Sequence, residues 1–343
     1  MTFLRRVLAF SILIACAVSA SALEKVSRTP YRGAIVIDDE SGKVLFEDNA
    51  DVQGYPASVT KLMTFFVVMD KVHAGQLTLE TPITVTAEAA KTGGSQVYLK
   101  QGEVFTVDDL LYALMIQSAN DAAVALAVHA AGSKEAFVEL MNTKAEQLGM
   151  THTLFHSPHG LPPDEKKGQQ VDRTTARDLA ILSRELINHG DILRYTSVQV
   201  RTLRGNTANP FEMRNHNHLL GKLAGCDGLK TGYFHLAGYS LSTTVTRNDR
   251  RIIAVILGAE TSQGRDLKMM ELVERGFASL PPIQTVKTGA PVATPTVAPG
   301  KPVPAQSTTP VKTAPTAQQS STATEPAVTF KVIPPPPAPS KKP

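Results

Sequence analysis

The chain has 343 residues, 42% of them hydrophobic, which is enough to bury a large core in one domain or two. The formal charge is +4, but residues 284–343 hold six lysines against the single Glu325. Together with Arg5 and Arg6 this leaves a charge of about −3 on residues 23–283. That part of the chain has no excess of lysine and arginine that could bind phosphate groups, which argues against nucleic acid as a partner.

Residues 1–22 have the pattern of a secretory signal peptide. Two arginines precede an apolar stretch over residues 7–18, and small residues end the pattern at Ala22. The apolar stretch is shorter than the roughly 20 residues that a spanning helix needs, and no other stretch reaches that length. We therefore expect an exported protein without a stable membrane anchor. The alternative is lipidation at Cys16, which would add an anchor.

Cleavage after Ala22 leaves Cys226 as the only cysteine. The exported protein then cannot form an internal disulfide, although its compartment is oxidising. A large hydrophobic core must stabilise it instead. We expect no metal ion and no cofactor.

Residues 23–283 form one predicted domain in which strands at both ends flank a helical middle. The expected strands cover residues 33–38, 43–47, 239–245 and 251–257. The expected helices cover an apolar run from about Ser58 to Met69 and residues 107–117, 119–131, 134–148, 174–188 and 265–280. Distant strands of this kind predict an α/β fold of the α+β type, with one sheet and helices packed beside it.

Residues 284–343 have a different composition. They contain 14 of the 23 prolines, together with threonine, alanine and serine and few large apolar side chains. Such a segment cannot bury enough surface to fold, so we expect an extended, disordered tail. Its simplest role is that of a spacer, and the alternative is an arm that threads the cell wall or docks a partner.

Ser58 and Lys61 form the first candidate catalytic pair. If a helix starts near Ser58, the two residues lie three positions apart on one face of its first turn, where a hydroxyl and an amine can touch. A helix N-terminus disfavours a cation, and burial adds to that effect, so the pKa of Lys61 should be lowered toward the range of a base. The plain alternative is a serine that caps the helix and a lysine that reaches solvent.

Two further motifs carry polar groups at places where chemistry is possible. Ser118 and Asn120 interrupt a run of apolar residues between two expected helices. They could cap the second helix, or Ser118 could relay a proton while Asn120 holds a substrate amide. The tripeptide Lys-Thr-Gly occurs three times, but residues 91–93 lie in a loop and residues 287–289 in the tail. Only residues 230–232 lead into a sequence that is typical of a β-strand, where Gly232 would admit a substrate close to the backbone.

These three motifs, in this order and at these spacings, resemble those of penicillin-binding proteins and serine β-lactamases. Longer matches resemble the low-molecular-mass D-alanyl-D-alanine carboxypeptidases of peptidase family S11; they cover residues 57–64, 118–123, 159–161, 175–179 and 227–233. The resemblance runs from about Tyr31 to about Leu280. It implies a β-lactamase/transpeptidase-like fold, a periplasmic location in a bacterial cell envelope, peptidoglycan stem peptides as substrates and β-lactams as inhibitors.

The resemblance also assigns catalytic roles to three residues. Ser58 would be the nucleophile that is acylated by the penultimate D-alanine of a stem pentapeptide while the terminal D-alanine leaves. Lys61 would accept the proton of Ser58, and Ser118 would pass a proton to the leaving amine, with Lys230 close by.

Substrate-binding roles follow from the same resemblance. The backbone N–H groups of Ser58 and Tyr233 would form the oxyanion hole, and Asn120 would hold the substrate amide. Thr231 and Arg265 would bind the free carboxylate of the substrate. The plain alternative for Arg265 is a surface arginine at a helix start. Asp227 and His159 would be structural, and Cys226 a packed thiol.

The sequence departs from the anchored members of the family, because no β-rich second domain and no amphipathic C-terminal helix follow the catalytic domain. This leaves D,D-endopeptidase cleavage of crosslinks open beside carboxypeptidase action. A β-lactamase would need an acid to activate water, and Glu185 is the nearest candidate. The last alternative is a cell-wall-binding scaffold without catalysis.

Overall fold

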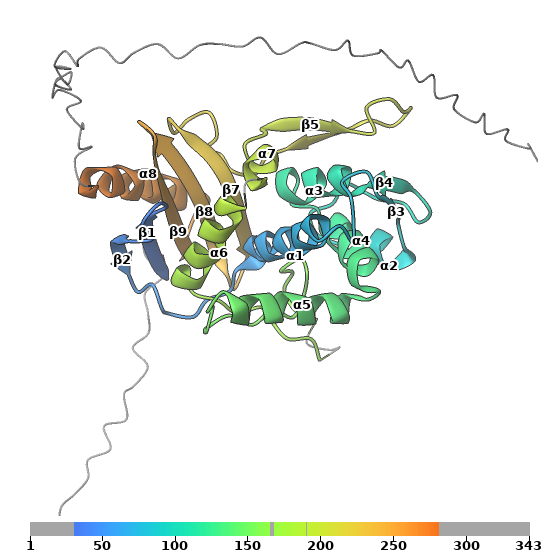
Figure 1. Cartoon of the computed structure of the whole chain (residues 1–343), viewed down its shortest axis with the longest axis horizontal. Coiled ribbons are helices and arrows are strands. Elements are labelled where there is room, and N and C mark those ends of the chain that lie inside the picture. The colour runs from blue at the N-terminus through green and yellow to red at the C-terminus, as the bar shows by residue number, and fades with distance from the viewer. Residues whose placement is uncertain (1–30, 165–167, 190, 281–343) are drawn as a thin grey trace, which may run out of the picture. The chain divides into compact units, whose positions relative to one another are not determined.

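The sheet at one end of the domain is built from strands of both chain ends, as the sequence predicts. The computed structural model describes residues 31–164, 168–189 and 191–280. The strands of the sheet are β1 (Gly33–Asp38), β2 (Val44–Asp48), β7 (Cys226–Phe234), β8 (Gly238–Arg247) and β9 (Arg250–Ala259). They pair antiparallel in the order β2-β1-β9-β8-β7, so β7 lies at an edge (Figure 1).

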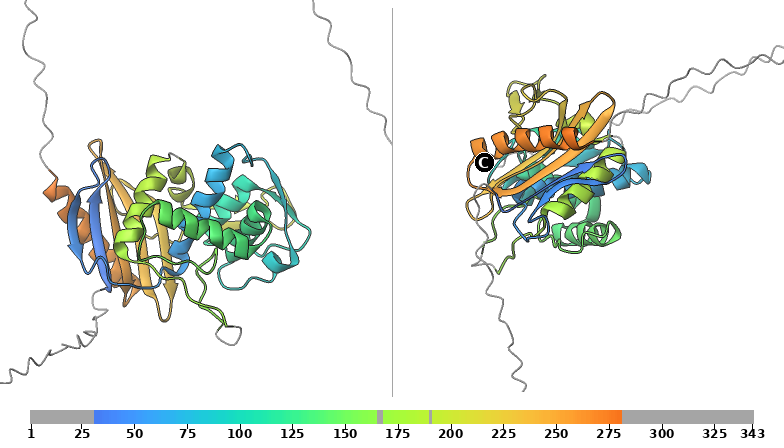
Figure 2. Two further views of the ribbon diagram at one scale, coloured as in Figure 1. Left: turned by 60° about the horizontal axis from the view of Figure 1, so that its bottom comes forward. Right: turned by 90° about the vertical axis from the view of Figure 1, so that its left-hand side faces the viewer.

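Strand β9 shows why the sheet needs cover on both faces. Ile252, Ala254 and Ile256 belong to one buried cluster, which also contains Met269 and Leu272 of helix α8 (Ser262–Ser279). The alternate residues of the strand belong to the main core; they are Ile253, Val255 and Leu257. Because side chains alternate along a strand, β9 is apolar on both faces. Helix α8 covers one face, and α6 (Ala176–Asn188) packs against the other (Figure 2).

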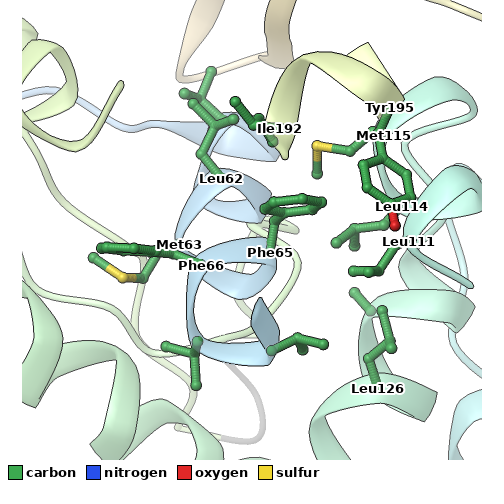
Figure 3. Packing of buried hydrophobic residues seen from close by; sticks show 14 of the residues in the cluster. Leu62, Met63, Phe65, Phe66, Leu111, Leu114, Met115, Leu126, Ile192 and Tyr195 are labelled. Atoms are coloured by element: carbon green, nitrogen blue, oxygen red, sulfur yellow. The ribbon is translucent and has the colours of Figure 1, made fainter. Parts of the chain in front are cut away.

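The helical part of the domain packs around α1 (Lys61–His73), which follows a short 3-10 helix, η1 (Ala57–Thr60). The other helices there are α2 (Ala87–Ala90), α3 (Val107–Ile116), α4 (Asn120–Ala131), α5 (Lys134–Gln147) and α7 (Ile192–Thr196). Figure 3 shows Phe65 of α1 between Leu62, Leu114 and Tyr195, and all four side chains are buried. Helix α1 is therefore apolar on nearly all sides, which explains its continuous run of hydrophobic residues.

Most of the longer helices begin with a side-chain cap. Thr106 forms a capping box with Asp109 at α3, and Ser133, Thr175 and Thr261 accept a backbone N–H at the starts of α5, α6 and α8. Helix α1 has no side-chain cap. Its first turn is thus not arranged for local helix stability.

The expected strands and helices are found with small shifts at their ends. The correction concerns Ser58, because the α-helix begins at Lys61 and Ser58 lies in the preceding 3-10 turn. Four short strands were not predicted; they are β3 (Pro82–Thr84), β4 (Val104–Thr106), β5 (Val200–Leu203) and β6 (Phe211–Arg214). Strands of three or four residues are too short to show an alternating pattern.

The leader, Cys16 and the tail lie outside the described residues, so the boundaries at Ala22 and Ile283 stay predictions. Within residues 31–164, 168–189 and 191–280, no helix combines the length and the hydropathy that crossing a bilayer requires.

We predict that Phe65→Ala lowers the free energy of unfolding by about 3 to 5 kcal/mol, because it leaves a cavity at the centre of the helical core. Phe65 is 2% exposed and lies edge-on to Tyr195, with 5.2 Å between the ring centroids. Urea unfolding followed by circular dichroism measures the change. The control Leu267→Ala, at a site that is 57% exposed, should cost less than about 0.5 kcal/mol. Equal losses in the two variants would contradict the assignment of the core.

Candidate active site

Lys61 is fully buried at the start of α1, and its ammonium nitrogen is surrounded by three oxygens. Nζ lies 3.0 Å from Ser58 Oγ, 2.7 Å from Asn120 Oδ1 and 2.7 Å from the backbone oxygen of His159. The alternative in which Lys61 reaches solvent is therefore wrong. Ser58 is only partly buried, and the cap next to it is Pro56, without a side-chain bond. The serine is thus not a helix cap either.

The three oxygens around Lys61 determine how it can exchange a proton with Ser58. An ammonium group donates three hydrogen bonds, whereas a neutral amine has two hydrogens and a lone pair. The oxygens of Asn120 and His159 are carbonyl oxygens and can only accept. When Lys61 is neutral, its lone pair must therefore face Ser58, whose hydroxyl is the one group of the three that can donate. The geometry makes the neutral lysine a base for Ser58.

The environment of Lys61 favours this neutral form. Burial lowers the pKa of Lys61 well below its usual range, and the charge of Lys230 lowers it further. The buried carboxylates of Asp172 and Asp121 act against this lowering of the pKa. The charges that act on this amine are therefore of both signs.

Strand β7 brings the second cation to the site. Lys230 is 1% exposed, and its Nζ donates to the backbone oxygen of Thr231 at 3.1 Å. Burial, with a smaller contribution from the charge of Arg265, lowers the pKa of Lys230 to about 7. A Cβ atom at Gly232 would lie 2.4 Å from the oxygen of Pro56 and 3.1 Å from the nitrogen of Ser58. Only glycine lets this strand edge pass so close to the turn that carries Ser58.

Ser118 lies at the junction of α3 and α4 with its hydroxyl buried and, within the described residues, without a hydrogen-bond partner. Its φ of 58° is in the left-handed region, as is that of Ala57 at 49°. Such a conformation costs a non-glycine residue about 1 kcal/mol or more, and such costs cluster at functional sites. The capping alternative is wrong, because α4 is capped by Ala119, without a side-chain bond.

Asn120 connects Lys61 to a loop that the sequence did not point to. Its Oδ1 accepts from Lys61, and its Nδ2 donates to the backbone oxygen of Gly93 at 2.8 Å. The backbone nitrogen of Asn120 donates to the oxygen of Ser95, also at 2.8 Å. The segment around the first Lys-Thr-Gly therefore supports the site through its backbone. Its lysine, Lys91, ends helix α2.

The structure places the remaining predicted site residues around β7. Thr231 is buried, and Tyr233 is 52% exposed and stacks on Tyr239. Arg265 is also buried, so the alternative of a surface arginine is wrong. Its guanidinium lies 3.4 Å from the backbone oxygen of Ser240, whose strand partner is Gly232, and it is held by Asp266 at 2.6 Å. Arg265 thus lies one strand away from Gly232 with a carboxylate beside it.

Asp227 and Cys226 make contacts inside the fold. Asp227 binds the guanidinium of Arg251 at 2.7 and 2.8 Å, and the thiol of Cys226 lies 3.4 Å from the hydroxyl of Thr243. Glu185, the acid considered for a β-lactamase, lines a separate cavity of about 210 Å³ beside β1 with Ile35 and Ile37. None of the three-motif residues lines that cavity.

Three contributors were missed by sequence reasoning. They are the backbone oxygens of His159 and Gly93 and the carboxylate of Asp172. Side-chain identity does not show which backbone atoms make contacts, so the match at residues 159–161 indicated a structural role for His159 but not the contact of its oxygen with Lys61, and nothing indicated the oxygen of Gly93. A cavity of about 700 Å³ adjoins Gly93 and His159, and its lining also includes Lys91 and Lys134. Within the described residues, no group of three or more His, Cys, Asp or Glu side chains could hold a metal ion.

The chain matches known proteins over the same region. The family model Peptidase_S11, described as D-alanyl-D-alanine carboxypeptidase, matches residues 21–261. The carboxypeptidase DacC of Escherichia coli K12 is 37% identical over 297 residues, which are 84% of this chain and 72% of that protein. DacF of Bacillus subtilis 168 is 35% identical over 272 residues, 78% of this chain and 68% of that one. A D-alanyl-D-alanine endopeptidase of Pseudomonas aeruginosa is 32% identical over 257 residues, 73% and 79% of the two chains.

Solved structures agree with these similarities. The ampicillin-bound penicillin-binding protein D2 of Listeria monocytogenes has a TM-score of 0.63 and 34% identity, covering 71% of this chain and 96% of that one. The carboxypeptidase DacD of Francisella tularensis has a TM-score of 0.65 and 30% identity, covering 71% and 69%. Both the family and the α+β fold predicted from the three motifs are confirmed. The chain belongs to peptidase family S11, the D-alanyl-D-alanine carboxypeptidases, and has the fold of the penicillin-binding proteins.

Proposed function

We propose that this protein is a serine D-alanyl-D-alanine carboxypeptidase that removes the terminal D-alanine from peptidoglycan stem pentapeptides through an acyl-enzyme. The observation that carries the proposal is the contact of 3.0 Å between Ser58 Oγ and the fully buried Lys61 Nζ, a serine held against its own base. The family membership and the named carboxypeptidases among its relatives support the substrate class.

Acylation begins when Lys61, as the neutral amine, takes the proton of Ser58. The oxygen of Ser58 attacks the carbonyl carbon of the penultimate D-alanine, and the negative charge moves to the carbonyl oxygen. That charge is stabilised by the backbone N–H groups of Ser58 and Tyr233, a type of interaction worth roughly 3 to 4 kcal/mol per donor. The close approach of Gly232 to the nitrogen of Ser58 supports this assignment.

The peptide bond breaks when its nitrogen receives a proton and free D-alanine leaves. Ser118 is suited to pass on this proton, because its buried hydroxyl has no hydrogen-bond partner within the described residues. Lys230 supplies positive charge nearby, and Thr231 and Arg265 bind the carboxylate of the substrate. Asn120 holds the substrate amide with the bonding capacity that Lys61 and Gly93 leave free. The proton that Lys61 took from Ser58 reaches the leaving amine through Ser118, so Lys61 is neutral again. A water molecule then attacks the ester carbonyl while Lys61 takes one of its protons. The ester bond breaks, the oxygen of Ser58 receives that proton, and the shortened stem leaves.

A β-lactam enters the same first step. Its strained amide is opened by Ser58, but the amine stays attached to the acyl group and cannot leave the site. The ampicillin-bound relative supports this reaction for the present chain. Export to the periplasm, and with it a role in cell-wall organisation and cell shape, fits this substrate class and the signal-peptide pattern of residues 1–22.

D,D-endopeptidase cleavage of crosslinked stems is the second candidate. The endopeptidase relative is covered over 79% of its length, more than the 68% and 72% of the two carboxypeptidases. The chemistry at Ser58 is the same, because the leaving amine then belongs to a second stem peptide.

We predict that penicillin adds its full mass to the protein and that Ser58→Ala abolishes this addition. Removal of the hydroxyl removes the acceptor of the acyl group, so the loss should be complete. Intact-protein mass spectrometry measures the adduct, and Ser279→Ala on helix α8 is the matched control that should label like the parent protein. An adduct of undiminished amount on Ser58→Ala would exclude the proposed nucleophile.

We also predict that acylation by penicillin follows a bell-shaped pH profile. The reaction needs neutral Lys61 and charged Lys230, so the rate should fall on both sides of an optimum; burial and the charge of Lys230 lower the pKa of Lys61, and the pKa of Lys230 is about 7. Lys230→Arg should keep the rising limb and shift the falling limb upward, because a guanidinium stays charged throughout. Stopped-flow measurements over a pH series check this. A falling limb that stays in place in Lys230→Arg would show that another group causes it.

A third prediction separates the two candidate substrates. Incubation with a stem pentapeptide should release free D-alanine, detected by mass spectrometry of the products, while a crosslinked muropeptide dimer is converted slowly or not at all. Ser58→Ala should convert neither substrate. If only the dimer is cleaved, the endopeptidase proposal replaces the carboxypeptidase proposal.

A further inference from the structure

Asp172 is a buried carboxylate that belongs to none of the three motifs. It is 3% exposed and lies just before helix α6. Its Oδ1 accepts from the backbone nitrogens of His156 and Ser157 at 2.7 and 3.0 Å. Its Oδ2 accepts from the hydroxyls of Thr60 and Ser157 at 2.8 and 3.2 Å. Thr60 immediately precedes Lys61, so this carboxylate ties the loop of residues 156–160 to the start of α1.

The loop continues the connection up to the amine of Lys61. The hydroxyl of Ser157 accepts from the backbone nitrogen of Gly160 at 2.9 Å, and Thr64 donates to the oxygen of Pro158 at 2.6 Å. Between these two points lies the backbone oxygen of His159 that holds Lys61. A Cβ atom at Gly160, where φ is 76°, would lie 1.9 Å from the oxygen of Ala57, so the loop also touches the turn of Ser58.

The contacts of Asp172 fit the charged carboxylate. A carboxylate only accepts hydrogen bonds, and all four groups around Asp172 are able to donate. Burial is the largest influence and raises the pKa of Asp172, and the bonds from His156, Thr60 and Ser157 oppose this rise. Each of these contacts is an attraction to negative charge, so together they hold the anion in place although it is buried.

The charge of Asp172 faces a site that contains other titratable groups. The groups whose charges act on Lys61, or on which the charge of Lys61 acts, are Lys230 on β7, Asp121 on α4, Asp172, His159 and His216. Burial, with the charge of Lys61, lowers the pKa of His159 to about 3, and burial with both lysines lowers that of His216 to about 4. Both histidines are therefore neutral near pH 7. The charges that act on Lys61 are those of Lys230, which lowers its pKa, and of Asp172 and Asp121, which raise it.

We propose that Asp172 is a positioning residue for Lys61: it fixes the loop that presents the backbone oxygen of His159 to the amine, and its negative charge opposes that of Lys230. The proposal rests on the proposed function, because Lys61 is the group it acts through. Asp172 touches neither Ser58 nor Lys61 directly, and its effect passes through Thr60, the loop and the electric field.

The charge is tested with Asp172→Asn, which keeps the shape of the side chain. The amide oxygen can still accept from the two backbone nitrogens, and the hydroxyls of Thr60 and Ser157 can reverse to accept from the amide nitrogen. Loss of the negative charge lowers the pKa of Lys61 further, so the rising limb of the acylation profile should move to lower pH. A limb that stays in place or moves to higher pH would overturn this part of the proposal.

The connection through the loop is tested separately with Ser157→Ala, which leaves the charge of Asp172 and breaks the link to Gly160. Penicillin acylation should slow by about tenfold or more, the effect expected when a group near the chemistry loses its position. Parent-like acylation of this variant would overturn the role of the loop. If circular dichroism shows that Asp172→Asn does not fold, the acylation rate of Ser157→Ala tests the proposal on its own.

Asp178→Asn is the matched control. Asp178 is a buried carboxylate that accepts from the backbone nitrogen of His152 at 3.0 Å and from the hydroxyl of Thr153 at 2.7 Å, but it is not among the charges that act on Lys61. Its profile and rate should match those of the parent protein, and an equal pH shift would count against the proposal. Labelling of the parent protein at Ser58 tests the proposed function independently of Asp172.

Discussion

The structure depends on a lysine that is completely removed from water. Burial of an unpaired ammonium is costly, and a protein meets this cost by supplying acceptors or by letting the group become neutral. Lys61 has both, because three oxygens surround its nitrogen while burial and Lys230 favour loss of the proton. Two of the oxygens can only accept. The neutral form is therefore directed toward the hydroxyl of Ser58, and the condition that makes the lysine hard to bury also makes it a base.

The fold provides this environment by bringing backbone atoms close together. Edge strand β7 reaches the turn of Ser58 because Gly232 has no side chain, and the loop of residues 156–160 reaches the same turn because Gly160 has none. Backbone groups then supply contacts that side chains would have to supply at higher entropic cost. The uncapped start of α1 and the left-handed Ala57 are local costs of the same arrangement. The apolar packing of α1 within the helical core offsets them.

Charge around the site is arranged in opposing pairs. The charges of Asp172 and Asp121 raise the pKa of Lys61, whereas that of Lys230 lowers it. Arg265 likewise forms an ion pair with Asp266. Such pairs let several ionisable groups remain buried in one place without a large net charge. They also mean that each group sets the protonation of its neighbours, so the site titrates as a coupled unit.

The sequence by itself determined the family, the order of the main strands and helices, and the residues of the three motifs. The amphipathic pattern of α6 and the continuous apolar run of β9 are visible directly in the sequence, and Ser58, Lys61 and Lys230 are identified by their motifs. Only the tertiary structure showed that Ser58 precedes the helix, that Lys61 is buried, and that Asp172 and the oxygen of His159 belong to the site. The physical reason is that burial, backbone contacts and electric fields arise between segments far apart in the chain. A one-dimensional pattern records which groups are present, whereas their distances exist only after the chain has folded.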